Sequence, residues 1–192
     1  LARVGSVNSF QKLIHTYFGL RLPNIKIAVT GTGRVAHGVL EIMNLMGIHE
    51  VETDEYLENE FTYPVYIHLK GADKKTGKYN RNDFHANPQN YDCRFIDYVS
   101  HTDILINGIY WEKNIPRLFE MEDIKKENFK LQTIADITDD LHGSVPCNLG
   151  DSSIANPVYG VDRNSFEKTA PYLPNSIDIM AVGNLPNELA RD

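Results

Sequence analysis

The stretch IKIAVTGTGRVAHGVLEIMNLM, residues 25–46, decides the fold of this chain. Its first six residues form a short apolar run with the character of a β-strand, and two glycines follow at once. Helical spacing then begins, with apolar side chains recurring at i, i+4, i+7 and i+11. The side chains that predict the inward face of this helix are Val35, Val39, Ile42 and Met46. A strand, a tight turn and a helix in this order give the pattern G-x-G-x-x-[G/A] the context of a dinucleotide-binding unit.

The residues of this motif have separate roles in such a unit. Gly31 permits the tight turn, Gly33 lets a pyrophosphate approach the backbone, and Ala36 lets helix and strand pack closely. The first N–H groups of the helix have no intrahelical partner, and the positive end of its dipole faces the phosphates. Arg34 could pair bidentately with a phosphate. We therefore expect the cofactor to contact Gly31, Thr32, Gly33, Arg34, Val35 and Ala36. A glycine-rich turn without a ligand is the alternative.

The composition limits the classes of function. A chain of 192 residues with 42% hydrophobic and 23% charged residues is typical of one globular domain. Its net charge of −7 argues against a nucleic-acid-binding surface. We find no signal peptide and no apolar run long enough to span a bilayer, so we expect no membrane partner. Cys93 and Cys147 lie too far apart in sequence for a disulfide framework or a metal site, which predicts a cytoplasmic location.

The N-terminal part of the chain precedes the nucleotide unit. The chain does not begin with methionine, which suggests a piece of a longer protein. Residues 8–18 predict an amphipathic helix with Asn8 or Ser6 as its N-cap. We expect residues 1–24 to be a connecting segment from an N-terminal domain that the chain lacks, and residues 25–192 to be the NAD(P)-binding domain. The helix could dock on its own domain or on a second copy, so a homo-oligomer stays open.

Further apolar runs predict the remaining strands and helices. The predicted strands are residues 48–54, 65–69, 103–108, 133–137 and 176–182, and the predicted helices between them are residues 94–101 and 115–129. Strands alternating with helices predict an α/β fold, a doubly wound and mostly parallel Rossmann-type sheet with helices on both faces. Because ligands of such sheets lie outside the carboxyl ends of the strands, the loops there are the expected site.

Four motifs occur in the order found in one known family. They are Gly31–Ala36, Asn107–Lys113, Asp136–Asp140 with Gly143-Ser144, and Leu185–Leu189. Together they resemble the nucleotide-binding half of the lysine-forming saccharopine dehydrogenases. The strongest likeness is to the lysine–2-oxoglutarate reductase domain of the bifunctional lysine-degrading enzyme, and a more distant one is to alanine dehydrogenase and transhydrogenase. The likeness covers nearly the whole chain from Ile25 to Glu188, and IYWEKNIPRLF (residues 109–119) is its most specific piece.

The resemblance implies an NAD(P)-dependent oxidoreductase of lysine metabolism that acts on the CH–NH group of an amino acid. In that family lysine and 2-oxoglutarate condense to an imine, and a hydride from the nicotinamide reduces the imine to saccharopine. The reverse oxidation releases lysine. The resemblance also implies two Rossmann-like domains with the active site between them, and a proton-transferring Lys and His in the N-terminal domain. This chain would then bind the cofactor and hold only part of the catalytic machinery.

The roles of single residues carry over by position. Asn107, Gly108 and Ile109 match the family loop that packs along the cofactor, and Asp136 is expected beside it. Asp140 matches a family aspartate near the nicotinamide and substrate, and it is the one catalytic residue expected in this chain. Its carboxylate could orient the nicotinamide amide or hold a cationic amine. The alternative is a loop of solvated acids that caps the following turn.

Two other functions stay open beside this one. An alanine dehydrogenase-like amino-acid dehydrogenase would share the fold and the cofactor. A non-catalytic dinucleotide-binding module is supported by Gly183, which stands where the family pattern carries an aspartate. The loss of that carboxylate puts in doubt any cofactor or substrate contact that it makes.

The choice between NAD and NADP depends on which run is the second strand of the nucleotide unit. By spacing, the acid that binds the adenosine ribose would be Glu52 or Asp54, and no Lys or Arg lies between residues 48 and 63. By resemblance, the second strand could instead be residues 65–69, with Lys70 at its end to receive a 2′-phosphate. The spacing favours NAD slightly.

Overall fold

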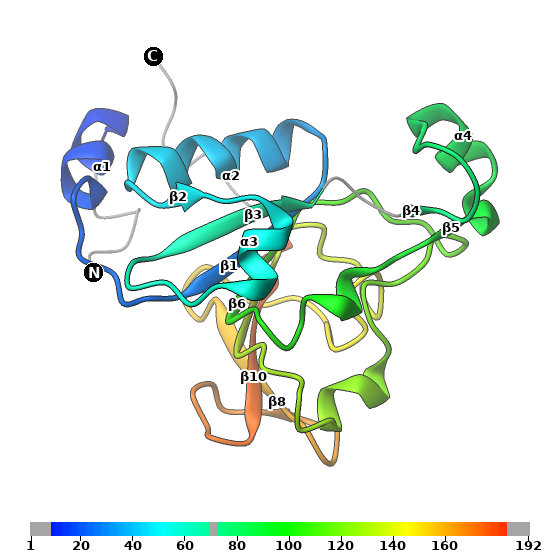
Figure 1. Ribbon diagram of the computed structural model, residues 1–192. Helices are drawn as coiled ribbons and strands as arrows, with labels where there is room; N and C mark the ends of the chain where they lie inside the picture. Colours follow the sequence, from blue (N-terminus) through cyan, green and yellow to red (C-terminus); the bar gives the residue numbers. More distant parts are fainter. Residues whose placement is uncertain (1–8, 70–72, 184–192) are drawn as a thin grey trace.

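The computed structural model describes residues 9–69 and 73–183. Its strands in the main sheet are β1 (Lys26–Thr30), β2 (His49–Glu50), β3 (Val65–Leu69), β6 (Ile104–Asn107), β7 (Thr133–Asp136), β8 (Val158–Asp162), β9 (Lys168–Thr169) and β10 (Ser176–Met180). These described strands form one eight-stranded sheet in the order β2-β3-β1-β6-β7-β10-β8-β9. The strands from β2 to β10 in this order run parallel, and β8 and β9 are antiparallel. The predicted Rossmann-type α/β fold is confirmed (Figure 1).

The strand–turn–helix unit forms as the sequence predicts. All five residues of β1 are buried, and helix α2 (Arg34–Leu45) follows the glycine turn. The predicted inward face of α2 is only partly correct, because Val35 is 45% exposed whereas Ala36 and Met43 are the buried residues of the helix. The first turn of α2 extends past the edge of the sheet, so Val35 lines a cavity there instead of the core.

The strand beside β1 is not the one that motif spacing indicated. The predicted strand 48–54 is only the short β2 at the sheet edge, and helix α3 (Thr53–Glu58) replaces its second half. β3 lies between β2 and β1, with Lys26 paired to Val65 and Thr30 paired to Leu69. β3 therefore occupies the place that the second strand takes in the usual Rossmann order.

The helix predicted over residues 115–129 is wrong, because the structure has only the 3-10 helix η4 (Met121–Lys125) there. The guanidinium of Arg163 donates hydrogen bonds to the carbonyls of Ile124, Phe129 and Leu131, so a distant side chain satisfies these backbone groups. The apolar residues of the segment still face inward. Of the helix predicted at 94–101, only the 3-10 helix η3 (Phe95–Asp97) is present.

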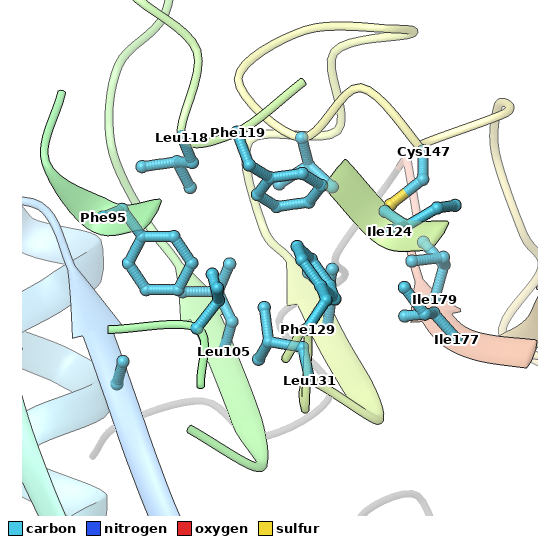
Figure 2. Close-up of a cluster of buried hydrophobic side chains, with 14 of the residues drawn as sticks. Phe95, Leu105, Leu118, Phe119, Ile124, Phe129, Leu131, Cys147, Ile177 and Ile179 are labelled. Atoms are coloured by element: carbon cyan, nitrogen blue, oxygen red, sulfur yellow. The ribbon is translucent and has the colours of Figure 1, made fainter. Parts of the chain in front are cut away.

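The core has a layer on each face of the sheet. On one face Met43 of α2 packs with Ile27 and Val29 of β1. On the other face a larger cluster contains Tyr56 of α3 and the side chains in Figure 2, where the rings of Phe119 and Phe129 lie 5.0 Å apart. Because coil and 3-10 turns cover much of this second face, the sheet is doubly wound with few regular helices.

Two β-hairpins were absent from the sequence prediction. β8 and β9 extend the sheet at its antiparallel edge. β4 (Asp73–Lys74) and β5 (Tyr91–Asp92) pair to enclose helix α4 (Arg81–Ala86) and the 3-10 turn η2 (Pro88–Asn90). We call residues 73–92 the α4 arm, and it projects from the body of the domain near the carboxyl end of β3 (Figure 1).

The N-terminal helix is present as α1 (Phe10–Tyr17), and its N-cap is Ser9, whose hydroxyl accepts from the N–H of Lys12. The predicted caps Asn8 and Ser6 lie outside the described residues. None of the helices in the described part of the chain is both long enough and apolar enough to cross a membrane.

Candidate functional site

A cavity of about 930 Å³ opens at the carboxyl edge of the parallel strands. Its walls come from the glycine turn, the end of β3, the α4 arm and the loops that follow β6 and β7. This volume is in the range of small-molecule sites. The position is where a doubly wound sheet binds its ligand, as the sequence predicts.

The glycine turn is shaped by close packing between neighbouring backbones. Gly31 has a φ of +114°, and its N–H donates to the carbonyl of Leu69 at 3.1 Å. A Cβ on Gly31 would lie 2.5 Å from the carbonyl oxygen of Gly108, so no side chain fits there. Ala36 is fully buried against the same loop. Gly31 and Ala36, the first and last positions of the motif, thus allow the glycine turn and the start of α2 to pack closely against the loop at Gly108.

Gly33 differs from Gly31 because open space lies in front of it. Among the described residues, a Cβ on Gly33 would meet nothing within 4 Å, and no side chain caps α2 at this N-cap position. The first N–H groups of α2 therefore have no intrahelical partner, and no side chain in the described part of the chain accepts from them at the cap. Donors at the positive end of a helix, beside a cavity, fit the phosphates of a dinucleotide.

The structure places most of the predicted cofactor residues on the wall of the cavity. Those that line it are Gly31, Thr32, Gly33, Arg34, Val35, Gly108, Ile109 and Asp140. Asn107, Asp136 and Glu52 are not on the wall, and Ala36 lies behind it. Lys70 lies outside the described residues, as does the motif Leu185–Leu189.

Asn107 and Asp136 are buried in a polar network behind the cavity. The Asn107 side-chain N–H₂ group donates to Asp136 at 2.8 Å and to the hydroxyl of Ser144 at 2.8 Å. Asp136 also accepts from the hydroxyl of Thr138 at 2.7 Å and from the amide of Asn148 at 2.9 Å. The polar groups of both side chains are satisfied by these hydrogen bonds. The two side chains therefore connect the ends of β6 and β7 and do not line the cavity.

Asp140 lies on a tight turn that presents it to the cavity. Its carbonyl accepts from the N–H of Gly143 at 2.8 Å, and a Cβ on Gly143 would lie 2.4 Å from the Cβ of Asp140. The far side of the turn is held by Arg117, which donates to the carbonyl of His142 at 3.1 Å. Burial, and then the negative charge of Asp136, raises the pKa of Asp140. The site thus holds a carboxyl that takes up a proton more readily than usual.

A second pair of acids lies behind this turn. Asp139 and Asp151 are hydrogen-bonded, and burial raises the pKa of Asp139, with the charge of Asp151 adding to the rise. A Cβ on Gly183 would lie 2.5 Å from an Asp151 oxygen and 2.8 Å from an Asp139 oxygen. This packing explains why glycine stands at position 183, because an aspartate there would bring a third carboxylate against the pair.

Glu52 is exposed at the start of α3, and it follows β2 at the sheet edge instead of the strand beside β1. The position beside the glycine turn belongs to His68 of β3, whose Nε2 lies 2.7 Å from the carbonyl oxygen of Gly31. Since that oxygen only accepts, Nε2 carries the proton of this bond.

Sequence reasoning missed the contribution of the α4 arm to the cavity. Tyr79, Arg81, Phe84 and His85 line it from that side. The local sequence pattern there indicates only a polar, turn-rich loop. Nothing in that pattern indicates that the loop folds back to line the cavity of the nucleotide unit. Within the described ranges, no group of three or more His, Cys, Asp or Glu side chains could hold a metal ion.

Comparisons with known proteins give relatives of one kind. No family model matches the chain. The chain is 29% identical over 188 residues to the mitochondrial alpha-aminoadipic semialdehyde synthase of Mus musculus and 30% identical to that of Bos taurus, in each case over 83% of this chain and 20% of the relative. It is 27% identical over 190 residues to the alpha-aminoadipic semialdehyde synthase of Arabidopsis thaliana, over 85% of this chain and 18% of the relative.

The chain therefore spans about a fifth of the length of these curated relatives. They are the bifunctional lysine-degrading enzymes to which the four sequence motifs pointed. The resemblance of this chain to the lysine–2-oxoglutarate reductase and saccharopine dehydrogenase family is thereby confirmed.

Proposed function

We propose that this chain is the dinucleotide-binding domain of an oxidoreductase that acts on the CH–NH group of an amino acid. The activity that we propose for the whole protein is that of a lysine–2-oxoglutarate reductase, with lysine, 2-oxoglutarate and saccharopine as its substrates and product. The observation that carries the proposal is the cavity at the uncapped start of α2, where Gly33 leaves open space for a phosphate. The similarity to alpha-aminoadipic semialdehyde synthases supports the choice of reaction.

The residues of the cavity have distinct roles in this proposal. The first amides of α2 and the exposed Arg34 hold the diphosphate, and Gly108 and Ile109 pack along the cofactor. The nicotinamide, when bound, supplies the hydride for the carbon that carries the amine. Asp140 follows β7, on the opposite side of β1 from β3, which is the nicotinamide half of a Rossmann cavity.

Asp140 is suited to a cationic partner at that end of the cavity. It is the one acid among the described residues that line the wall. A carboxylate there can accept from the nicotinamide amide or hold an ammonium group of the substrate. The proton-transferring Lys and His of the family would come from a domain that precedes this segment, so Asp140 positions the reactants instead of carrying the whole reaction.

The cofactor in this proposal is NAD or NADP. The spacing favours NAD only if residues 48–54 form the second strand of the nucleotide unit, because Glu52 would then bind the adenosine ribose. The sheet order removes that reason, because β3 lies beside β1 and Glu52 follows the edge strand β2. The choice then depends on the residues around the adenosine end of the cavity.

Other properties of the whole protein stay predictions. We keep residues 1–24 as a connecting segment and residues 25–192 as the NAD(P)-binding domain. We also keep a cytoplasmic location, although the mouse and cattle relatives carry the word mitochondrial in their names. Docking of α1 on a second copy of the chain is a further prediction, and it would be checked by the oligomeric state in solution.

The proposed function is tested by a binding experiment and by an activity assay. Titration of the chain with reduced nicotinamide dinucleotides should raise the nicotinamide fluorescence and saturate at one site, and the absence of any binding would overturn the proposal. The full-length protein should oxidise the reduced cofactor only when lysine and 2-oxoglutarate are both present. Turnover with alanine alone would favour an amino-acid dehydrogenase, and binding without any turnover would favour a non-catalytic module.

A further inference from the structure

We propose that a small pocket at the amino edge of the sheet is a second binding site, which holds the carboxylate or phosphate group of a small anion between Lys26, Lys130 and His101. The pocket shares no lining residue with the cofactor cavity, so this inference does not depend on the proposed function.

The pocket lies at the opposite edge of the sheet from the cofactor cavity. Lys26 is the first residue of β1, Asp103 directly precedes β6, and Lys130 comes shortly before β7. Because these three strands are parallel, their amino ends lie together at one edge, away from the carboxyl ends that border the cofactor cavity. The pocket has a volume of about 180 Å³. Since this is the liquid volume of about six water molecules, the pocket has room for an oxyanion of a few heavy atoms.

Lys26 brings a nearly buried ammonium group to this pocket. The residue is only 9% exposed, and its Nζ lies 5.0 Å from the ring centroid of Tyr56 and 5.5 Å from that of Phe61. The ammonium group has three N–H donors, and one of them donates to the carbonyl of Asn59 at 2.9 Å. No carboxylate in the described part of the chain forms an ion pair with it. Because a buried charge without an opposite charge is costly, an anion in the pocket would stabilise this lysine.

Two more basic side chains lie near the ammonium group of Lys26. Burial lowers the pKa of Lys26, and the charge of Lys130 adds to the lowering, whereas Glu60 and Asp103 oppose it. Burial also lowers the pKa of His101, and the charges of Lys26 and Lys130 lower it further. The three basic groups are thus close enough to repel one another when they are charged. A bound anion would offset that repulsion and favour the charged form of each group.

The two acids of the pocket leave this positive charge only partly balanced. Asp103 is bound to the backbone of β1, because its Oδ2 accepts from the N–H of Lys26 at 2.9 Å and its own N–H donates to the Lys26 carbonyl at 2.9 Å. Glu60 is exposed, so water and salt screen its charge. A small anion inside the pocket would lie closer to the buried ammonium group than a screened carboxylate at the surface does.

The experiment titrates the 192-residue chain with two small anions and follows its NMR spectrum. Sulfate is the tetrahedral probe and malonate is the carboxylate probe, and sodium chloride keeps the ionic strength constant. At least one probe should shift the signals of residues 100–103, including the His101 ring, and the shifts should saturate. Saturation by sulfate alone assigns the site to phosphate groups, and saturation by malonate alone assigns it to carboxylates. Shifts that do not saturate, or that spread over the whole surface, would overturn the inference and leave the proposed function intact.

Two variants of opposite charge change test whether the pocket itself binds the anion. Lys130→Ala should weaken the bound probe about tenfold, as expected for the loss of one charge-assisted contact. Glu60→Gln should tighten binding, because it removes a negative charge and keeps the size of the side chain. Lys12→Ala removes one positive charge from α1, outside the pocket, and should change binding by less than about twofold. All three residues are exposed, and thermal unfolding checks that each variant is folded. Equal effects of Lys130→Ala and Lys12→Ala would contradict a site in this pocket.

His101 adds a pH dependence that a purely structural role would not produce. Sulfate keeps its charge over the range in which histidine titrates, so a change in its affinity reports on the protein. Because a bound anion favours the charged imidazole, sulfate should bind more tightly at about pH 6 than at about pH 8. The charges near His101 are Lys26 and Lys130, which oppose its protonation, and Glu60, which favours it. The pH dependence should disappear in His101→Gln, and an unchanged pH profile in this variant would overturn the place of His101 in the site.

Discussion

The side-chain amide of Asn107 donates a 2.8 Å hydrogen bond to the carboxylate of Asp136, and both side chains are closed off from solvent. This bond joins the carboxyl ends of β6 and β7, which are neighbours in the sheet. The loops that carry Gly108 and Asp140 to the cavity begin immediately after these two strand ends. A buried polar network therefore sets where the wall of the cofactor cavity lies.

Removing the carboxylate of that network should cost stability. Asp136→Ala leaves the buried side-chain amides of Asn107 and Asn148 without their acceptor, so the free energy of unfolding should fall by about 3 kcal/mol. Urea denaturation measures it. Glu122→Ala breaks only an exposed ion pair with Lys125 and should cost less than about 0.5 kcal/mol. Equal losses in the two variants would contradict the structural role of Asp136.

A side chain at Gly33 should block the cofactor without unfolding the chain. Gly33→Val points into open space at a backbone position that needs no glycine, so stability should change by about 1 kcal/mol or less. Binding of a reduced dinucleotide should fall more than about tenfold, because the added side chain takes the place of a phosphate. Gly38→Ala, farther along α2, is the control and should bind normally. Normal binding by Gly33→Val would place the phosphates elsewhere.

The raised pKa of Asp140 predicts a pH-dependent stability. Because burial and the charge of Asp136 raise the pKa of Asp140 in the folded chain, the folded state holds this proton more tightly than the unfolded state. The ionised carboxylate thus opposes folding above that raised pKa. Asp140→Asn should unfold at a higher urea concentration than wild type at pH 7, and the difference should vanish below the ordinary pKa of an aspartate. A variant less stable at pH 7 would show that the carboxylate stabilises the fold.

Restoring the acid of the family pattern at position 183 should destabilise this chain. In Gly183→Asp the new Cβ meets the oxygens of Asp139 and Asp151, and a third carboxylate adds repulsion. We expect a loss of about 1–3 kcal/mol at pH 7, which should shrink at acidic pH as the carboxyls take up protons. Thermal unfolding at both pH values measures it. Gly183→Asp combined with Asp151→Gly should recover part of the loss, and a full loss in the double variant would contradict this packing.

The local patterns of the sequence determined the centre of the fold. The apolar run of β1, the glycine turn and the helical spacing of α2 all lie within residues 25–46, and nearest neighbours in the chain are enough to specify them. The predicted strands around residues 103–108, 133–137 and 176–182 were found in the same way. Their short apolar runs indicate strands of a parallel sheet, and β10 is buried along most of its length, whereas every second residue of β6 and β7 is only half-buried.

The tertiary structure decided the features that depend on residues far apart in the chain. Arg163 donates to the carbonyls of Ile124, Phe129 and Leu131 in and beside the segment where a helix was expected, and β3 separates β2 from β1. Asn107 and Asp136 turn away from the cavity because buried donors and acceptors must find partners across strands. Arg81 reaches the cavity only because the α4 arm packs against Trp111 and Tyr110. Hydrophobic period and turn residues encode the elements, whereas contacts between distant residues determine which side chains meet the ligand.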